Sequence, residues 1–303
     1  MAILPSFIKM LVTGLRLGSV YALIALGYTM VYGVLKFINF AHGDFIMVGG
    51  YTLLFTAPIM SFAGFPAWTA VFFAVAVCAA VSVLTEMIAY RPVRKRGNSM
   101  SALITAIAMS LILENLAQYL ISSTNTGYGA AVCRLFPPGK INFSGVSISL
   151  SSVISIITGI VIMILLYLLV NKTKIGRAMR AVSEDKYAAE ITGVNVNRIV
   201  SVTFAIGGAL AAAAALMWFS EYSGTTPVIG TTLGMFAFSA AVLGGIGSIP
   251  GAVLGGFIIG LSYSFTTAYI SSGFADAVVF IILILILILK PTGLLRRNEG
   301  EKV

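Results

Sequence analysis

Nine apolar stretches follow one another along the chain, and most of them are about as long as a membrane span. A helix needs about 20 mostly apolar residues to cross the hydrocarbon core of a bilayer. Of the 303 residues, 59% are apolar and only 10% are charged, which is far more apolar surface than one soluble core can bury. The stretches cover residues 12–35, 45–61, 66–89, 100–122, 150–170, 199–219, 231–247, 251–271 and 275–290. We therefore predict an all-α, polytopic membrane protein in which residues 1–303 form one transmembrane domain of eight or nine helices.

Two of these stretches, 45–61 and 231–247, are short and lie beside polar interruptions at 36–44 and 246–250. Non-helical backbone at membrane depth is tolerated only where protein buries it or where it lines a water-filled cavity. We therefore expect short or broken spans at these two places.

The basic residues are confined to short segments between the apolar stretches, which argues against nucleic-acid binding despite a net charge of +9. Fifteen of the 19 Lys and Arg residues lie in segments 91–97 and 171–198, in the C-terminal tail and at Lys36. Segments rich in Lys and Arg stay on the cytoplasmic side of a membrane. The count predicts that these segments and the C-terminus are cytoplasmic and that the loop at 123–149 is external.

Small residues recur at four-residue spacing in several apolar stretches, where they let helix backbones approach closely in lipid. Examples are Gly14, Gly18 and Ala22, and later Gly247, Gly251 and Gly255, with Gly256 and Gly260 following. We expect most of these positions to be packing contacts within the chain, and a subunit interface is the alternative.

Ionisable residues inside a span are costly, and Glu114 is the one that the sequence places deepest. Ser110, Glu114 and Gln118 are spaced four residues apart and therefore share one helix face. This stripe predicts either an interhelical hydrogen-bond network or part of a polar path. Glu86, near the end of its span, can reach the interface or pair with Arg91.

The only histidine, His42, lies in the segment from Asn39 to Asp44, directly before a short span. Gly43 between polar residues can end one helix and start another, and a new helix N-terminus attracts anionic groups. Transporters use broken helices in this way. Isolated as it is, His42 predicts a structural role and no metal site.

No sequence pattern supports catalysis. The chain lacks a G-x-x-x-x-G-K-[ST] phosphate loop as well as H-E-x-x-H and G-x-S-x-G motifs. We expect no enzyme activity and no cofactor bound by this chain.

The polar segment 171–198 is patterned like a docking element. Ser183, Glu184 and Asp185 are typical of a helix start, and Gly193 is typical of a helix stop. Between them, Ala188, Ala189 and Ile191 would form a small apolar surface that fits a groove on another protein. The alternative is a solvated loop that lies on its own protein.

Three stretches together resemble one family, the H-type (LivH-like) permeases of bacterial high-affinity branched-chain amino acid ABC importers. They are GSVYALIALGYTMVYG at 18–33 with INFAHGD at 38–44, the segment 181–193, and AAVLGGIGSIPGAVLGG at 240–256. The resemblance covers almost the whole chain. The segment departs from the usual motif of importer permeases at two points. Tyr187 stands where these permeases often have Glu before Ala-Ala, and the Leu-Pro found downstream in the fuller motif is absent.

The resemblance implies an ABC importer permease fold in the bacterial inner membrane and a transport subunit for leucine, isoleucine and valine. It implies four kinds of partner: a second, related permease, two cytoplasmic ATPase subunits that hold ATP and Mg²⁺, an external solute-binding protein and the amino acid substrate. The implied ATPase-coupling residues are Glu184, Asp185, Ala188, Ala189, Ile191 and Gly193.

Polarity suggests where the amino acid crosses. We expect the translocation path at Asn39, His42, Gly43, Asp44, Ser110, Glu114, Gln118, Gly244, Gly245 and Gly247. Alternatives are a permease for another amino acid or for urea or an amide, and an ion-coupled secondary transporter. The last should have paired ionisable residues at mid-membrane, and the sequence offers only Glu114 there. A channel would need a selectivity filter, which no motif marks.

Overall fold

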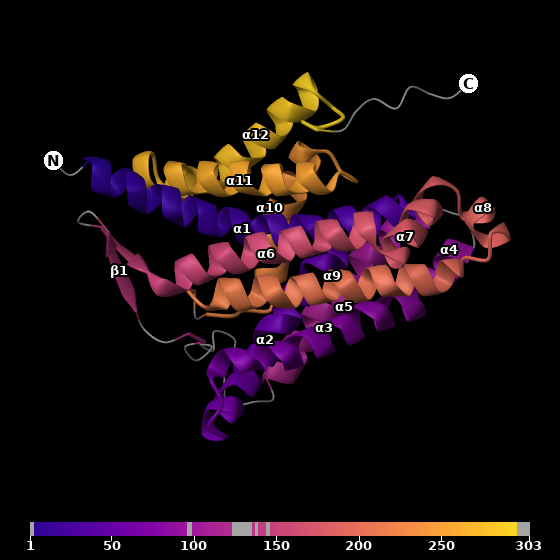
Figure 1. The fold of residues 1–303 in the computed structure, drawn as a ribbon, viewed down its shortest axis with the longest axis horizontal. Coiled ribbons are helices and arrows are strands. Elements are labelled where there is room, and N and C mark those ends of the chain that lie inside the picture. Colours follow the sequence, from indigo (N-terminus) through magenta and orange to yellow (C-terminus); the bar gives the residue numbers. More distant parts are fainter. Residues whose placement is uncertain are drawn as a thin grey trace. The chain divides into compact units, whose positions relative to one another are not determined.

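The computed structural model describes residues 3–95, 99–122, 135–136, 139–143, 146–222 and 224–295. Each of the nine predicted apolar stretches is a helix in this part of the chain (Figure 1). These helices are α1 (Ile3–Leu35), α2 (Asp44–Phe62), α3 (Val71–Thr85), α5 (Ser99–Ser122), α6 (Leu150–Lys172), α9 (Val196–Phe219), α10 (Ile229–Gly244), α11 (Ile249–Tyr269) and α12 (Ala275–Leu289). The prediction of an all-α, multi-pass membrane protein is confirmed.

Eight of the described helical segments are long and apolar enough to cross a membrane, and α10 is shorter. The short stretch at 45–61 gains length because the turn at 40–42 precedes α2. Three shorter helices are α4 (Arg91–Lys95), α7 (Lys174–Glu184) and α8 (Lys186–Ile191). Strands β1 (Lys140–Phe143) and β2 (Val146–Ser149) form an antiparallel pair within the predicted external loop.

The chain divides into two compact units, which are described separately. Unit 1 consists of Met1–Thr29, Pro138–Met163 and Phe236–Val303. Unit 2 consists of Met30–Pro137 and Ile164–Met235.

In unit 1 the small residues of α1 lie against those of α11, and the two helices run side by side in Figure 1. A methyl group on Gly260 would come 2.2 Å from the backbone nitrogen of Gly18, and one on Gly256 would come 2.5 Å from the Cα of Ala22. The backbones therefore touch directly. This contact confirms the prediction of close packing within the chain at these positions.

The glycine-rich segment of unit 1 is a tight turn between α10 and α11. A methyl group on Gly244 would lie 1.9 Å from the carbonyl oxygen of Gly251. Gly245 and Gly247 have φ values of 100° and 98°, a region that favours glycine. Gly247 therefore does not continue the helical stripe that its spacing suggested, and Ser248 caps the N-terminus of α11 instead.

In unit 2 helices α2, α3 and α9 pack around one another, again through small residues. A methyl group on Gly208 of α9 would lie 2.5 Å from the carbonyl oxygen of Cys78 in α3. The Ser82 hydroxyl donates a 2.8 Å hydrogen bond to the carbonyl oxygen of Phe204 across the same contact. This three-helix core holds the start of α2 in place.

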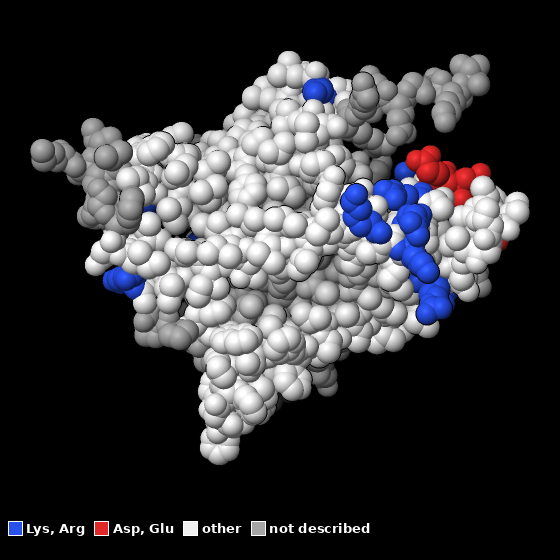
Figure 2. Space-filling view, in the orientation of Figure 1, with Lys and Arg blue, Asp and Glu red and all other residues white. Residues whose placement is uncertain are grey.

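Positive charge gathers at one end of unit 2. Figure 2 shows Lys and Arg side chains clustered over α7, with acidic side chains beside them near α8. The residues of this stretch that are basic and exposed are Lys172, Lys174, Arg177 and Arg180. They belong to the segment for which the sequence predicts a cytoplasmic position.

Candidate functional site

The predicted helix break at residues 36–44 is present. Helix α1 ends at Leu35, and Lys36 follows with a φ of 62°. A single 3-10 turn at Phe40–His42 leads into α2, which begins at Asp44. The polar segment therefore places a new helix N-terminus inside unit 2.

Asp44 is fully buried at this N-terminus. A methyl group on Gly43 would lie 2.3 Å from the carbonyl oxygen of Gly230, and one on Gly230 would lie 2.9 Å from Asp44 Oδ1. The carboxylate of Asp44 thus lies against the first turn of α10 as well as in the first turn of α2. The positive ends of two helix dipoles therefore point toward this buried carboxyl group.

Glu114 of α5 faces the same first turn of α10, because it accepts a hydrogen bond from the Thr231 hydroxyl. Ser110, one turn earlier on α5, interacts favourably with the carboxylate of Asp44, whereas Glu114 repels it. Three helices thus bring Asp44, Ser110, Glu114 and Thr231 together, and we call these four residues the carboxylate cluster. The expectation that Glu114 alone is a deep ionisable group is wrong, because helix α2 buries Asp44 beside it.

The remaining predicted path residues divide between the two units. Gln118 is partly exposed on the same face of α5 as Glu114, in unit 2. Gly244, Gly245 and Gly247 belong to unit 1, where they form the turn before α11. Their role in a common path stays a prediction.

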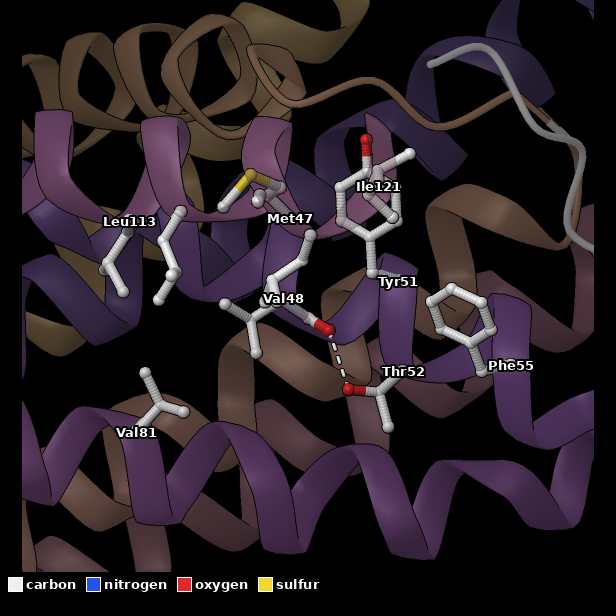
Figure 3. Close-up of a pocket in the computed structure, with 11 residues that line it drawn as sticks. Met47, Val48, Tyr51, Thr52, Phe55, Val81, Leu113 and Ile121 are labelled. Atoms are coloured by element: carbon white, nitrogen blue, oxygen red, sulfur yellow. Dashed lines mark hydrogen bonds between the residues drawn. The ribbon is translucent and has the colours of Figure 1, made fainter. Parts of the chain in front are cut away.

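An apolar pocket of about 280 Å³ lies between α2, α3 and α5, one helical turn from Asp44 along α2, and is lined by none of the four residues of the carboxylate cluster (Figure 3). Met47 and Val48 lie one helical turn after Asp44, and Leu113 and Ala117 flank Glu114 on α5. Tyr51 extends into the pocket in Figure 3. The Tyr51 hydroxyl is buried and has no hydrogen-bond partner among the described residues.

His42 has a structural environment, as its isolation predicted. Its ring is fully buried and lies edge-on to Phe45, with ring centroids 5.8 Å apart. A methyl group on Gly207 of α9 would lie 3.5 Å from it. Within the described residues no group of three or more His, Cys, Asp or Glu side chains is arranged to hold a metal ion.

Asn39 anchors the start of the break from inside the protein. Its Oδ1 accepts a 2.6 Å hydrogen bond from the Tyr90 hydroxyl, and both side chains are buried. Tyr90 ends a π-helical turn, Glu86–Tyr90, that follows α3. Such turns interrupt α-helices and are often found at functional sites. Tyr90 lay outside the sequence-based prediction, because no local motif marks a partner 51 residues away.

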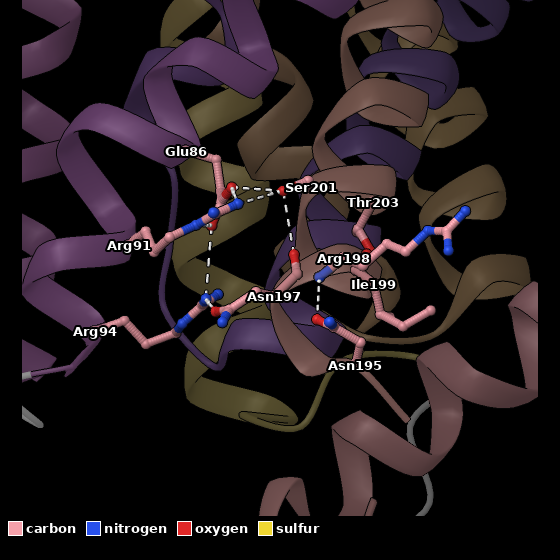
Figure 4. Close-up of polar contacts among 9 residues, drawn as sticks. All are labelled: Glu86, Arg91, Arg94, Asn195, Asn197, Arg198, Ile199, Ser201 and Thr203. Carbon is pink, nitrogen blue, oxygen red and sulfur yellow. Dashed lines mark hydrogen bonds and ion pairs between the residues drawn. The ribbon is translucent and has the colours of Figure 1, made fainter. Parts of the chain in front are cut away.

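Glu86 begins the same π-helical turn and is fully buried in an ion-pair network (Figure 4). Arg91 contacts both of its carboxylate oxygens, at 3.2 and 2.8 Å, and Arg94 lies 3.6 Å away. The Ser201 hydroxyl of α9 donates a 2.8 Å hydrogen bond to Glu86 and accepts one of 2.7 Å from Arg91. The predicted pairing of Glu86 with Arg91 is confirmed.

The network also reaches the short helix α8. Glu190 of α8 attracts Arg94 electrostatically. Partial burial, reinforced by the nearby charges of Arg94 and Lys36, lowers the pKa of Lys186 at the start of α8. Helix α8 therefore lies within electrostatic range of the residues that hold Glu86.

Two helices, rather than one, cover the predicted docking segment. Ser183 and Glu184 end α7, and Asp185 is extended, with a φ of −149°. The Asp185 carboxylate accepts hydrogen bonds from the backbone N–H groups of Tyr187 and Ala188, which caps α8. The prediction that the helix starts with its acids in the first turn is therefore wrong by about one turn, because Asp185 is the N-cap itself.

Helix α8 ends as predicted and exposes a small apolar face. Gly193, with a φ of 85°, stops the helix. The side chains of Tyr187 and Ile191, one turn apart, are 81% and 88% exposed, and Ala188 is exposed beside them. Ala189 is buried against the protein, so the expected surface includes Tyr187 in its place. Glu184 and Asp185 are exposed at the edge.

Comparison with known proteins gives a consistent result. Residues 10–288 match the family model described as branched-chain amino acid transport system / permease component. The chain is 41% identical to the high-affinity branched-chain amino acid transport system permease protein BraD of Pseudomonas aeruginosa, over 98% of each protein. It is also 41% identical to LivH of Escherichia coli over 98% of each, and 30% identical to a probable LivH of Methanocaldococcus jannaschii over 94% of this chain and 92% of that protein.

Proposed function

Since the chain belongs to the family of branched-chain amino acid transport permease components, we propose that it forms the membrane path of an ATP-driven importer of leucine, isoleucine and valine. The observation that carries this proposal is the 41% identity to high-affinity branched-chain amino acid permeases over 98% of the chain. The chain is a transport subunit and not an enzyme, as expected for this family.

We propose four kinds of partner for this chain. Three are proteins of the importer: a second, related permease, two ATPase subunits that bind ATP and Mg²⁺, and an external solute-binding protein. The fourth is the amino acid substrate. The chain itself would bind no cofactor. The first step of a cycle would be delivery of the amino acid by the binding protein, and ATP hydrolysis would take place entirely on the partner subunits.

The exposed face of α8 is the surface that we propose for ATPase docking. Tyr187, Ala188 and Ile191 present apolar area next to the acidic Glu184 and Asp185, on a helix short enough to enter a groove. Tyr187 and Ile191 are more than 80% exposed and lie one turn apart, and neighbouring exposed apolar side chains of this kind are typical of a protein interaction surface. Gly193 would keep this helix short and Ala189 would hold it to the protein.

Docking of a cytoplasmic ATPase requires α8 to lie on the cytoplasmic side of the membrane, and the distribution of charge agrees with this orientation. The basic cluster over α7 supports a cytoplasmic position for this end under the positive-inside rule. The same rule assigns the C-terminal tail to the cytoplasm and residues 123–149 to the exterior, and most residues of both segments lie outside the described part of the chain.

A chain of contacts in unit 2 would carry movement of α8 to the helix break. Glu190 attracts Arg94, Arg94 contacts Glu86, and Glu86 begins the π-helical turn that ends at Tyr90. Tyr90 is bonded to Asn39 at the start of the break. We propose that docking and release at α8 shift this turn and with it the N-terminus of α2.

The path would run past the break and the polar face of α5. Asn39, His42, Gly43 and Asp44 would form one wall, and Ser110, Glu114 and Gln118 another. Gly244, Gly245 and Gly247, which form the turn before α11 in unit 1, remain predicted path residues of that unit.

Two measurements test the proposal. The tagged chain, purified in a mild detergent, should bring down an ATPase and a second permease, and the complex in proteoliposomes should accumulate leucine only with ATP and binding protein. Glycine, urea and acetamide in the same assay distinguish the related substrate classes.

The pairing of Asp44 with Glu114 favours one rival, because ion-coupled secondary transporters place ionisable pairs at mid-membrane. Uptake by the isolated chain that is driven by a proton or sodium gradient, without ATP, would support that rival and contradict the importer.

A further inference from the structure

We propose that the carboxylate cluster and the adjoining apolar pocket form a substrate subsite in unit 2, which takes a primary ammonium group on the carboxylates and a branched aliphatic chain in the pocket. This inference rests on the proposed function and specifies where the substrate is recognised in the membrane.

The carboxylate end of the subsite is defined by a buried carboxyl group that has no basic partner in the described part of the chain. Neither oxygen of Asp44 meets a donor in good hydrogen-bond geometry among the described residues, although the side chain is fully buried. Ser110 and Glu114 are the polar side chains that interact with it, and the effect of Glu114 is repulsive. Two carboxyl groups close together cannot both stay charged unless a proton or another cation lies between them.

The direction of the Asp44 side chain supports the same conclusion. Its Oδ1 lies against Gly230, and the next residue, Thr231, holds Glu114 through a hydrogen bond. Asp44 and Glu114 therefore converge on the first turn of α10 from two different helices. An ammonium group has three N–H donors, which match two carboxylates and a hydroxyl group such as that of Ser110.

The apolar end of the subsite begins within one helical turn of both carboxylates. Met47 and Val48 follow Asp44 on α2, and Leu113 and Ala117 flank Glu114 on α5 (Figure 3). The cavity of about 280 Å³ is close in size to the smallest pockets that hold small ligands. Burial of an aliphatic chain there is favourable by about 0.8 kcal/mol per CH₂ group, whereas glycine would leave the pocket empty.

The main rival occupant is an acyl chain of a membrane lipid. A lipid chain would explain the apolar lining, but it would leave the repulsion between Asp44 and Glu114 without compensation. The charge next to the pocket therefore favours an amphipathic cation over a hydrocarbon chain.

Access to the pocket can be measured with one engineered cysteine. In a chain with Cys78→Ala and Cys133→Ser, Ala117→Cys places a thiol in the wall of the pocket, and Ser122→Cys places one at the exposed end of the same helix, where the span ends. The assembled importer in nanodiscs is treated with a water-soluble maleimide. Because the thiolate is the reactive form, a thiol reacts quickly only where water reaches it.

We expect leucine to slow the reaction at position 117 several-fold and to leave position 122 unchanged. 3-Methylbutylamine, which keeps the ammonium group and the branched chain, should also protect, whereas 4-methylpentanoate and glycine should not. Glu114→Gln should weaken protection by leucine about tenfold or more, because it removes a charged hydrogen-bond acceptor.

Three results would overturn the subsite. The first is that leucine does not slow the reaction at position 117 in a complex that still imports leucine. The second is that 4-methylpentanoate slows the reaction as much as leucine does. The third is that the thiol at position 117 does not react in any state. A reaction rate that follows the acyl-chain length of the nanodisc lipid and ignores leucine would assign the pocket to lipid. A complex that imports no leucine would instead contradict the proposed function, which keeps the two failures distinct.

Discussion

The hydroxyl of Tyr90, at the end of the π-helical turn after α3, donates a 2.6 Å hydrogen bond to Oδ1 of Asn39, at the start of the break before α2. Both side chains are buried. The bond joins the part of unit 2 that carries the Glu86 network to the part that leads into Asp44. The proposed route from α8 to the carboxylate cluster passes through this hydrogen bond.

Tyr90→Phe tests this link. The substitution keeps the ring and leaves Oδ1 of Asn39 without its donor, so we expect a loss of about 1–3 kcal/mol in unfolding free energy. ATP hydrolysis by the assembled complex should continue while leucine uptake falls, because the break no longer follows α8. Denaturant unfolding and paired ATPase and uptake assays measure these effects. Tyr119→Phe, on the exposed face of α5, is the matched control. Equal uptake by the two variants would contradict the proposed route.

Glu86→Gln tests the ion-pair network. Removal of one partner of a fully buried ion pair costs about 3–5 kcal/mol, and the cost here should be lower, about 1–3 kcal/mol, because the arginines that remain are partly exposed to solvent. We expect a loss of stability in this range, and Ser201→Ala should cost about 1–2 kcal/mol by itself. In a double-mutant cycle the two effects should not add, since both side chains share one hydrogen-bond network. Additive losses would show that Ser201 and Glu86 act independently.

Ile191→Asp tests the docking face of α8. The side chain is 88% exposed, so the folded chain should keep its stability within about 0.5 kcal/mol. Copurification of the ATPase should fall strongly, because a charge enters an apolar interface. Ile175→Asp, on α7, is the control, since Ile175 is also exposed in the same polar segment. The proposed docking face is contradicted if the Ile191 variant copurifies with as much ATPase as the control variant does.

Gly260→Ala tests the backbone contact between α1 and α11. A methyl group there would lie 2.2 Å from the backbone nitrogen of Gly18, and backbone cannot move aside as a flexible side chain can. We expect a loss of about 1–3 kcal/mol, as for other overpacked sites. Gly33→Ala is the control, because nothing lies within 4 Å of the added carbon. Thermal unfolding in detergent compares the two, and equal midpoints would contradict the contact.

The sequence alone was sufficient to predict the helices, because a bilayer forces about 20 apolar residues into each span and this length is visible locally. It also predicted the break at 36–44 and the stop at Gly193. Polar residues and glycine interrupt an apolar helix at their own positions, so these signals are visible locally in the sequence. The pairing of Glu86 with Arg91 could also be predicted from the sequence, because the two residues lie only five positions apart.

Contacts across long distances in the sequence required the tertiary structure. The sequence does not show that Asp44 is a deep ionisable group, because its burial comes from Gly230 of α10, and it does not mark Tyr90, whose partner is Asn39. The sequence predicts Ala189 in the apolar surface of α8, beside Ala188 and Ile191, where the structure has Tyr187, because a six-residue helix carries too few positions to show which side faces the protein.

The amino-acid sequence by itself thus determined that this protein is a multi-pass helical permease component, because hydropathy, charge and glycine spacing act along the chain. Only the tertiary structure decided which polar groups meet. Asp44, Ser110, Glu114 and Thr231 come from three helices, and their spacing depends on how glycines let those helices approach. Such proximity is a property of packing and leaves no local pattern in the sequence.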